Sequence, residues 1–241
     1  MFLKHAKVVV SGKAFESLDA FSKTASKKLK VFANAKFTEL LADVHEAYNI
    51  SPNVSDYIFV VARAVTADVP NENRDGFSER ELLDLKKSGS FCYESFIGCP
   101  MLEEHDDSDI KRIAGGFIVD AYYDDVDIKD RKVVALLAVD KNKKKKFATN
   151  ILNGVTEAFS MGCICESTTC SKCGNIAKYE SQYCDHIKAK YSPLNFNKEA
   201  FEWCNGVTFR ELSHVENPAD KTALSKGCCS TDNSGNVICK V

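Results

Sequence analysis

The stretch DYIFVVARAV, residues Asp56–Val65, predicts a long buried strand because it is dense in β-branched and aromatic residues. Further strands are predicted around it, over 113–123, 132–139, 155–165 and 206–215. Only a few helices separate these strands, and they do not alternate with them regularly, which disfavours a parallel βαβ architecture. We therefore expect an α+β fold in which a partly closed antiparallel β-barrel is surrounded by helices.

Two of the predicted helices carry clear local signals. In Lys36–Tyr48 the apolar residues recur at helical spacing and share one face. Ser78 and Glu81 form a capping-box pattern, which predicts a helix over 79–87 that is ended by Gly89.

The composition of the chain divides it into three segments. Residues 1–50 are predicted to be an N-terminal segment that contains the first helix, and residues 51–225 to be the main domain. A Cys- and His-rich insert is predicted within this domain, over 163–190. Residues 226–241 are rich in Gly, Ser and Asn and are predicted to form a flexible tail.

Length and charge limit the classes of function. The 241 residues are 44% hydrophobic, enough for a sizeable core, and the net charge is −2. Because acidic and basic residues nearly balance, the chain has no strong positive field, and this disfavours nucleic acid and membrane surfaces as partners. The N-terminal apolar run Val8–Val10 is too short for a signal peptide, and no window approaches the roughly 20 apolar residues of a membrane helix. We expect a soluble intracellular protein.

The eleven cysteines are odd in number, and without an export signal a complete disulfide framework is disfavoured. Cys170 and Cys173 form a C-x-x-C knuckle, and Cys184 and His186 follow after a ten-residue gap. Three thiolates and an imidazole at this spacing fit a closed, tetrahedral and therefore structural Zn²⁺ site. Two alternatives remain open, a redox-active C-x-x-C pair and unligated buried thiols.

Cys163 and Cys165 precede the knuckle, and their spacing on the predicted strand places them on the face opposite Ser160. They are interpreted as core residues or as spare metal ligands.

Two local features could carry covalent catalysis. PMLEEHDD (100–107) places His105 in a polar turn, and GVTEAFSMG (154–162) places Ser160 near the end of an apolar segment. A serine hydroxyl needs an imidazole to accept its proton, and it needs backbone N–H groups directed at the developing oxyanion. Gly162 would leave room for a substrate carbonyl. Spacing by itself leaves open that His105 is a surface histidine and Ser160 an ordinary strand residue.

The order of four stretches resembles the tailed-phage prohead (capsid maturation) serine proteases, which are similar in fold to the herpesvirus assemblins. The stretches are NENRDGFSERELL, CPMLEEHDD, GVTEAFSMGC and FRELSHVENPADKTAL, and they cover roughly residues 57–224. The resemblance places His105 at the catalytic histidine and Ser160 at the nucleophile. It makes residues 51–225 the protease domain, with an assemblin-like barrel.

The family also implies a third polar residue that supports the histidine. Glu211 matches the glutamate of the family's last strand, whereas His214 stands where many members carry an apolar residue. Residues 211 and 214 of a strand point to opposite faces, so only one of them can face the pair. Glu211 is favoured, His214 is the alternative, and Asp106 is interpreted as structural. The oxyanion is expected to meet backbone N–H groups near Met161 and Gly162.

The resemblance implies a serine endopeptidase that processes phage scaffold and major capsid proteins inside the immature prohead, in the host cytoplasm. Self-cleavage of a precursor is also implied. The alternative is a non-catalytic, zinc-stabilised prohead core or scaffold protein of the same fold. A nucleic-acid-binding zinc module is disfavoured by the near-neutral charge.

Overall fold

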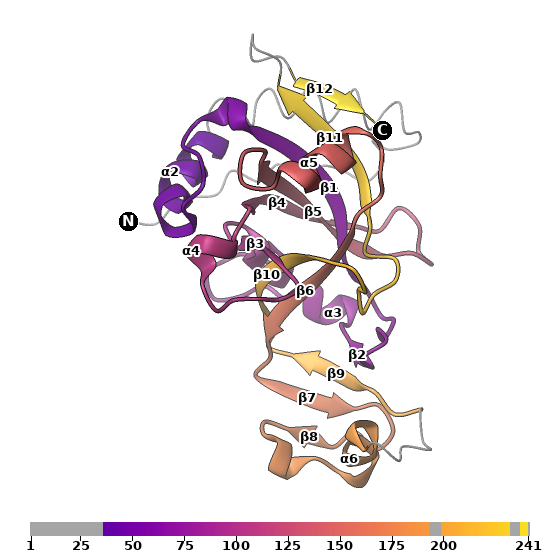
Figure 1. Cartoon of the computed structure of the whole chain (residues 1–241). Coiled ribbons are helices and arrows are strands. Elements are labelled where there is room, and N and C mark those ends of the chain that lie inside the picture. Colours follow the sequence, from indigo (N-terminus) through magenta and orange to yellow (C-terminus); the bar gives the residue numbers. More distant parts are fainter. Residues whose placement is uncertain (1–35, 193–198, 232–236, 241) are drawn as a thin grey trace.

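The computed structural model describes residues 36–192, 199–231 and 237–240. They form a large part built on an eight-stranded sheet, and a small part below it built on a four-stranded sheet (Figure 1). The large sheet has the order β12-β11-β1-β5-β4-β3-β10-β6 and curls into a half-barrel with helices outside it. This architecture confirms the predicted α+β class.

The strands of the large sheet are β1 (Tyr57–Thr66), β3 (Pro100–Glu103), β4 (Gly116–Asp124), β5 (Lys132–Asp140), β6 (Ala158–Ile164), β10 (Thr208–Val215), β11 (Ser225–Thr231) and β12 (Val237–Lys240). The small sheet, ordered β2-β9-β7-β8, contains β2 (Asp75–Gly76), β7 (Ser167–Cys170), β8 (Ile176–Ala177) and β9 (Glu202–Asn205). The α-helices are α2 (Lys36–Tyr48), α3 (Glu79–Leu82), α4 (Ile110–Ile113), α5 (Lys145–Leu152) and α6 (Asp185–Tyr191). Short 3₁₀ helices are η2 (Val54–Asp56), η3 (Cys92–Phe96) and η4 (Glu180–Gln182).

Strand β1 is buried on both faces, which explains its continuous apolar run. Ile58 and Val60 lie in the main core inside the curled sheet, whereas Tyr57 and Phe59 lie in a second cluster on the other face. Helix α2 covers that second cluster with Phe37, and its bounds are those predicted from the sequence. A strand packed on both sides reads as uniformly hydrophobic and not as alternating.

One strand pairing departs from the predicted antiparallel barrel. Strands β3 and β10 are parallel, with Leu212 beside Met101 and Ser213 beside Leu102. Parallel neighbours need a long connection, and more than a hundred residues separate these two strands along the chain. This pairing positions the candidate site, because it brings the end of β3 beside the C-terminal half of β10, where Glu103 lies opposite His214.

Helix α3 is shorter than predicted. The Ser78 cap is present, with its Oγ accepting a hydrogen bond from the Glu81 N–H at 3.1 Å. The helix ends at Leu82, and the chain then turns so that Leu85 forms a β-bridge with Phe91. Tertiary pairing thus replaces the later turns expected from local propensity.

Two strands, β11 and β12, lie within residues 225–240, which overlap the segment 226–241 that is predicted to be a flexible tail. Strand β11 pairs with the outer edge of β1, where Val60 lies opposite Cys228, and β12 pairs in turn with β11. The open edge of β1 offers unpaired backbone groups, and burial of Cys228 adds to the pairing. Residues 232–236 and 241, and the segment 1–35, lie outside the described residues.

The small part extends beyond the predicted insert 163–190. Strand β9 pairs with β7 on one side and with β2 on the other, so the sheet needs residues 202–205 and two residues from near the start of the main domain. None of the helices within the described ranges is long and apolar enough to cross a membrane.

Candidate active site and metal centre

His105 lies in a tight turn directly after β3. Glu104 and His105 have φ angles of 50° and 58°, in the left-handed region that non-glycine residues rarely adopt. The turn is held by strand β10: the His105 N–H donates to Ser213 Oγ at 3.2 Å, and the Glu104 N–H donates to the His214 carbonyl at 3.0 Å. Such strained backbone persists only where its surroundings fix it, and it is common at functional sites.

The imidazole of His105 contacts the Glu211 carboxylate. His105 Nδ1 and Glu211 Oε1 are 2.8 Å apart, and Ser213 Oγ donates to the other oxygen, Oε2, at 2.5 Å. Ser213 is fully buried, so this hydroxyl has a fixed position. A carboxylate at Nδ1 favours the tautomer with its proton on that nitrogen, which leaves Nε2 free to accept a proton.

Strand register places Ser160 on the same face as Glu211. Across the β6–β10 pairing, Ser160 lies opposite Ser213 and Gly162 lies opposite Glu211. Cross-strand partners project to the same side of a sheet. Ser160 and His105 also line one cleft, which has a volume of about 340 Å³. The fold therefore brings together Ser160, His105 and Glu211 from three separate strand regions.

His214, the alternative third member, points to the opposite face of β10. Its Nε2 lies 2.8 Å from Glu157 Oε2, and its ring packs edge-on against Phe147. The structure thus separates residues 211 and 214 as the strand period predicts. Asp106 is bonded to Ser108 and is not placed at the His105 ring.

Ser213 was not singled out from the sequence, although it orders both the carboxylate and the histidine turn. The sequence offers one indication of this role: Ser213 lies two residues from Glu211, and residues two apart share a face of a strand.

Met161 and Gly162 follow Ser160 along β6, the last strand of the large sheet. Among the described residues, the outer edge of β6 has one bridge, between Ala158 and Leu224. Backbone groups of an edge strand are available to an extended ligand.

Gly162 is required by the position of Glu211. A Cβ atom built on Gly162 would lie 3.0 Å from Glu211 Cδ and closer still to Oε1. We expect Gly162→Ala to displace the carboxylate from His105 and to slow the hydrolysis expected from the sequence about 100-fold, because small misplacements of groups in an active site carry costs of this size. Steady-state rates, together with thermal melting, would check this, and an unchanged rate in a folded variant would contradict it.

The pKa of His105 is raised above its ordinary value, chiefly because the Glu211 carboxylate accepts a hydrogen bond from the ring, and burial only partly opposes this. Neutral imidazole is the form that accepts a proton, so the capacity of His105 to act as a base should fall as the pH drops through this raised pKa. We expect Glu211→Gln to lower the His105 pKa and to shift the acid limb to lower pH. Histidine NMR titrations would measure this, with His105→Gln assigning the resonance; an unmoved pKa would refute the coupling.

Three thiols also line the cleft: Cys163, Cys165 and Cys204. Cys163 Sγ and Cys165 Sγ are 3.8 Å apart, and both residues pack against the main core. Hydrogen bonds from Cys163 and Cys204 lower the pKa of the Cys165 thiol. Cys163 and Cys165 are thus core and cleft residues and not part of the metal-binding group below.

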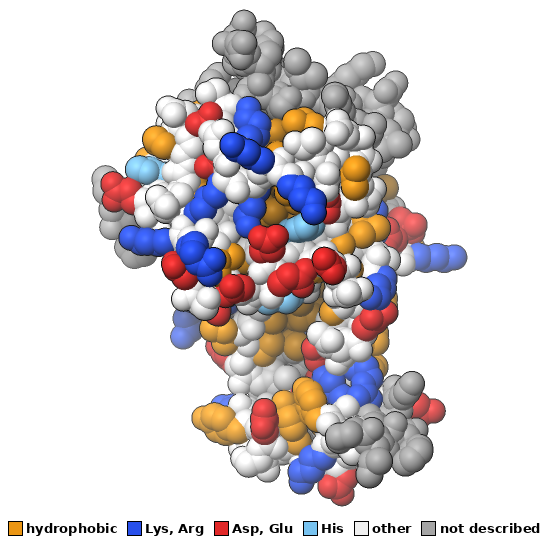
Figure 2. Space-filling model, in the orientation of Figure 1, with side chains coloured by type: hydrophobic (Ala, Val, Ile, Leu, Met, Phe, Trp, Pro, Cys, Tyr) orange, Lys and Arg blue, Asp and Glu red, His pale blue; other side chains and the backbone are white. Residues whose placement is uncertain are grey.

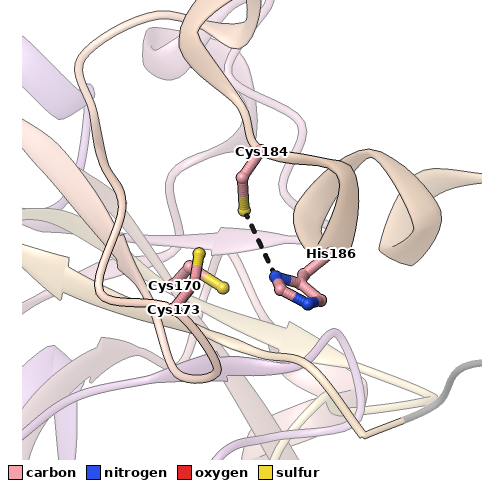
Figure 3. Close-up of side chains that lie close together, drawn as sticks. All are labelled: Cys170, Cys173, Cys184 and His186. Carbon is pink, nitrogen blue, oxygen red and sulfur yellow. Dashed lines mark hydrogen bonds between the residues drawn. The ribbon is translucent and has the colours of Figure 1, made fainter.

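The predicted metal ligands converge in the small part. The ligand atoms of Cys170, Cys173, Cys184 and His186 all lie within 4.8 Å of one another. Figure 3 shows their side chains directed at a common point, with Cys184 Sγ 3.9 Å from His186 Nδ1. Sulfurs bound about 2.3 Å from a tetrahedral ion lie roughly 3.8 Å apart, so this group could hold a metal ion.

Local structure explains how the ligands reach this point. Cys170 ends β7, and the knuckle turns through Gly174 at φ 71°, a conformation that favours glycine. The Lys172 N–H points at Cys170 Sγ at 3.4 Å, as expected for a thiolate ligand. Cys184 precedes α6, and His186 lies in its first turn.

Comparison of the chain with protein-family models, with curated proteins and with solved structures finds no match.

Proposed function

We propose that the protein is a serine endopeptidase in which Ser160 is the nucleophile, His105 the general base and Glu211 the residue that orients it. The observation that carries this proposal is the His105–Glu211 hydrogen bond, formed over the face of the sheet that displays Ser160. An imidazole polarised by a carboxylate and sharing a cleft with a serine is the arrangement that nucleophilic acyl transfer needs.

In this mechanism His105 Nε2 takes the proton of Ser160 as Oγ attacks a peptide carbonyl. Glu211 keeps the other proton on Nδ1 and stabilises the imidazolium that forms. Ser213 holds the carboxylate in place from its far oxygen. His105 then protonates the leaving amine, and water hydrolyses the acyl-enzyme with His105 again as base. Backbone N–H groups around Met161 and Gly162 are proposed to bind the oxyanion.

The resemblance of four ordered motifs to prohead proteases supports a narrower proposal. The substrates would be phage scaffold and major capsid proteins, cut inside the immature prohead in the host cytoplasm, and the protease would also process its own precursor. The half-barrel would then be of the assemblin type.

Zn²⁺ is the metal that the ligand set favours, because three thiolates and one imidazole complete a tetrahedral shell. A shell closed by four protein ligands leaves no position for water, so its role would be structural. The residues that would hold it are Cys170, Cys173, Cys184 and His186.

A non-catalytic prohead core protein of the same fold is the competing function. A fluorophosphonate probe distinguishes the proposed protease from the non-catalytic protein, because it reacts with an activated serine nucleophile. Wild-type protein should be labelled at Ser160, as mapped by peptide mass spectrometry, and Ser160→Ala and His105→Gln should not be labelled. Thr156→Ala is the matched hydroxyl control. Absence of labelling in the wild type, or labelling only at Cys165, would favour the non-catalytic protein.

A further inference from the structure

The cleft beside Ser160 has two walls, which come from different parts of the molecule. One wall belongs to the large part and includes His105 and Val69. The other belongs to the small, metal-binding part and includes Thr168, Tyr183 and Tyr191. A polypeptide bound along this cleft would lie between the two walls, with the small part on one side.

Helix α6 fixes this second wall at both of its ends. Its first turn carries the ligand His186, and its last turn carries Lys190. The Lys190 ammonium is 2.6 Å from Asp75 on β2 and 2.7 Å from Glu202 on β9, and its side chain is only 3% exposed. A buried charge with two partners is costly to separate, so the helix is held firmly against the strands β2 and β9 of the small sheet.

Two tyrosines give the wall an aromatic surface. The rings of Tyr183 and Tyr191 are stacked, with centroids 5.7 Å apart and planes 13° from parallel. The Tyr191 hydroxyl donates to Glu202 at 2.7 Å, which fixes the ring while the residue stays 59% exposed.

The wall from the large part includes one exposed apolar side chain, Val69, which is 54% exposed and stands among polar residues such as Asn71 and Asn73. Figure 2 shows hydrophobic side chains gathered at the narrow waist between the two parts. Exposed apolar side chains that are grouped in a cleft mark a binding site more strongly than scattered ones.

We propose that the metal-braced small part is a substrate-binding wall, in which Tyr183 and Tyr191 select polypeptide segments that carry a large apolar side chain near the cleaved bond. This inference rests on the proposed protease function. An apolar side chain placed between Val69 and the two rings removes all three surfaces from water, which favours binding. The metal then serves recognition as well as folding, because it holds the helix that presents Tyr191.

The test compares covalent probes that share one reaction with Ser160 but differ in size. Diisopropyl fluorophosphate is small, whereas tripeptidyl phosphonates carry glycine, leucine or phenylalanine at each position in turn. In the wild type, leucine or phenylalanine at one position should raise the second-order inactivation rate roughly 10- to 100-fold over glycine. Tyr183→Ala and Tyr191→Ala should remove most of this gain and leave the diisopropyl fluorophosphate rate within about twofold.

Two controls separate recognition from folding. Tyr191→Phe keeps the ring and should retain the preference, and Tyr179→Ala, an exposed tyrosine of the small part outside the cleft, should behave as wild type. Metal content should stay unchanged in every variant. If the alanine variants keep the full preference, or if the wild type has none, the wall proposal fails. If diisopropyl fluorophosphate does not label Ser160 at all, the protease function itself fails.

Discussion

Glu211→Gln is expected to slow peptide-bond hydrolysis about 10⁴-fold without unfolding the protein, by analogy with the same change in serine protease triads. A glutamine amide can present its NH₂ group to His105 Nδ1. The ring proton would then move to Nε2, where it blocks acceptance of the Ser160 proton. The side chain is also neutral, so it no longer stabilises the imidazolium. Rates on a cleaved protein substrate, with circular dichroism for the fold, would measure the effect.

The chain offers a matched control on the other face of the same strand. His214 and Glu157 form a second His–Glu pair with the same 2.8 Å separation. Glu157→Gln changes a similar pair outside the Ser160 cleft and should leave hydrolysis within about threefold of wild type, in the range of substitutions that avoid catalytic contacts. If Glu157→Gln slowed hydrolysis as much as Glu211→Gln, the assignment of the third residue would be wrong.

Cys173→Ser is expected to abolish metal binding and to unfold the small part locally. The buried cluster of this part is small, with Cys170, Ile187 and Ala200 at its centre. A core of this size rarely supports a fold without a metal or a cross-link. Metal analysis should find one ion per wild-type chain and none in the variant. Limited proteolysis should then cut within 171–183, and zinc chelation should reproduce the cut in the wild type.

Cys99→Ser is the control for this experiment. The Cys99 thiol lies in the large part and donates to the Ser95 carbonyl at 3.2 Å, a contact that a hydroxyl can keep. Metal content and protease resistance should therefore match the wild type. A Cys173→Ser protein that retained a full equivalent of metal and resisted proteolysis would exclude the four-ligand site.

Helix α2, strand β1 and the cluster of four candidate metal ligands could be predicted because their signals are local. The helical spacing of apolar residues in Lys36–Tyr48 and the apolar run of Asp56–Val65 follow from which face each residue buries. The C-x-x-C knuckle predicts its own geometry, since two ligands three residues apart can only meet in a tight turn. For the candidate catalytic residues, the order of motifs named His105, Ser160 and Glu211, but not how they meet.

The proximity of His105, Ser160 and Glu211 depends on contacts between segments far apart in the chain. The parallel pairing of β3 with β10 sets the His105 turn over Glu211, and the β6–β10 register sets Ser160 opposite Ser213. No local pattern encodes either pairing, because strand partners are selected by burial in the whole sheet. The same cause explains why α3 is shorter than predicted and why strands lie within 225–240: β-pairing with residues elsewhere in the chain outweighs local propensity.

The sequence by itself determined the α+β class, the chemistry of the metal ligands and the residue types available for nucleophilic catalysis. Only the tertiary structure decided that Glu211 and not His214 contacts His105, that Ser213 contacts both Glu211 and the His105 backbone, and that the small part with the Cys/His cluster borders the cleft. The physical reason is the distance along the chain over which the deciding interactions act. Side-chain chemistry and periodicity are properties of neighbouring residues, whereas a site is assembled by strand register and packing across the whole chain.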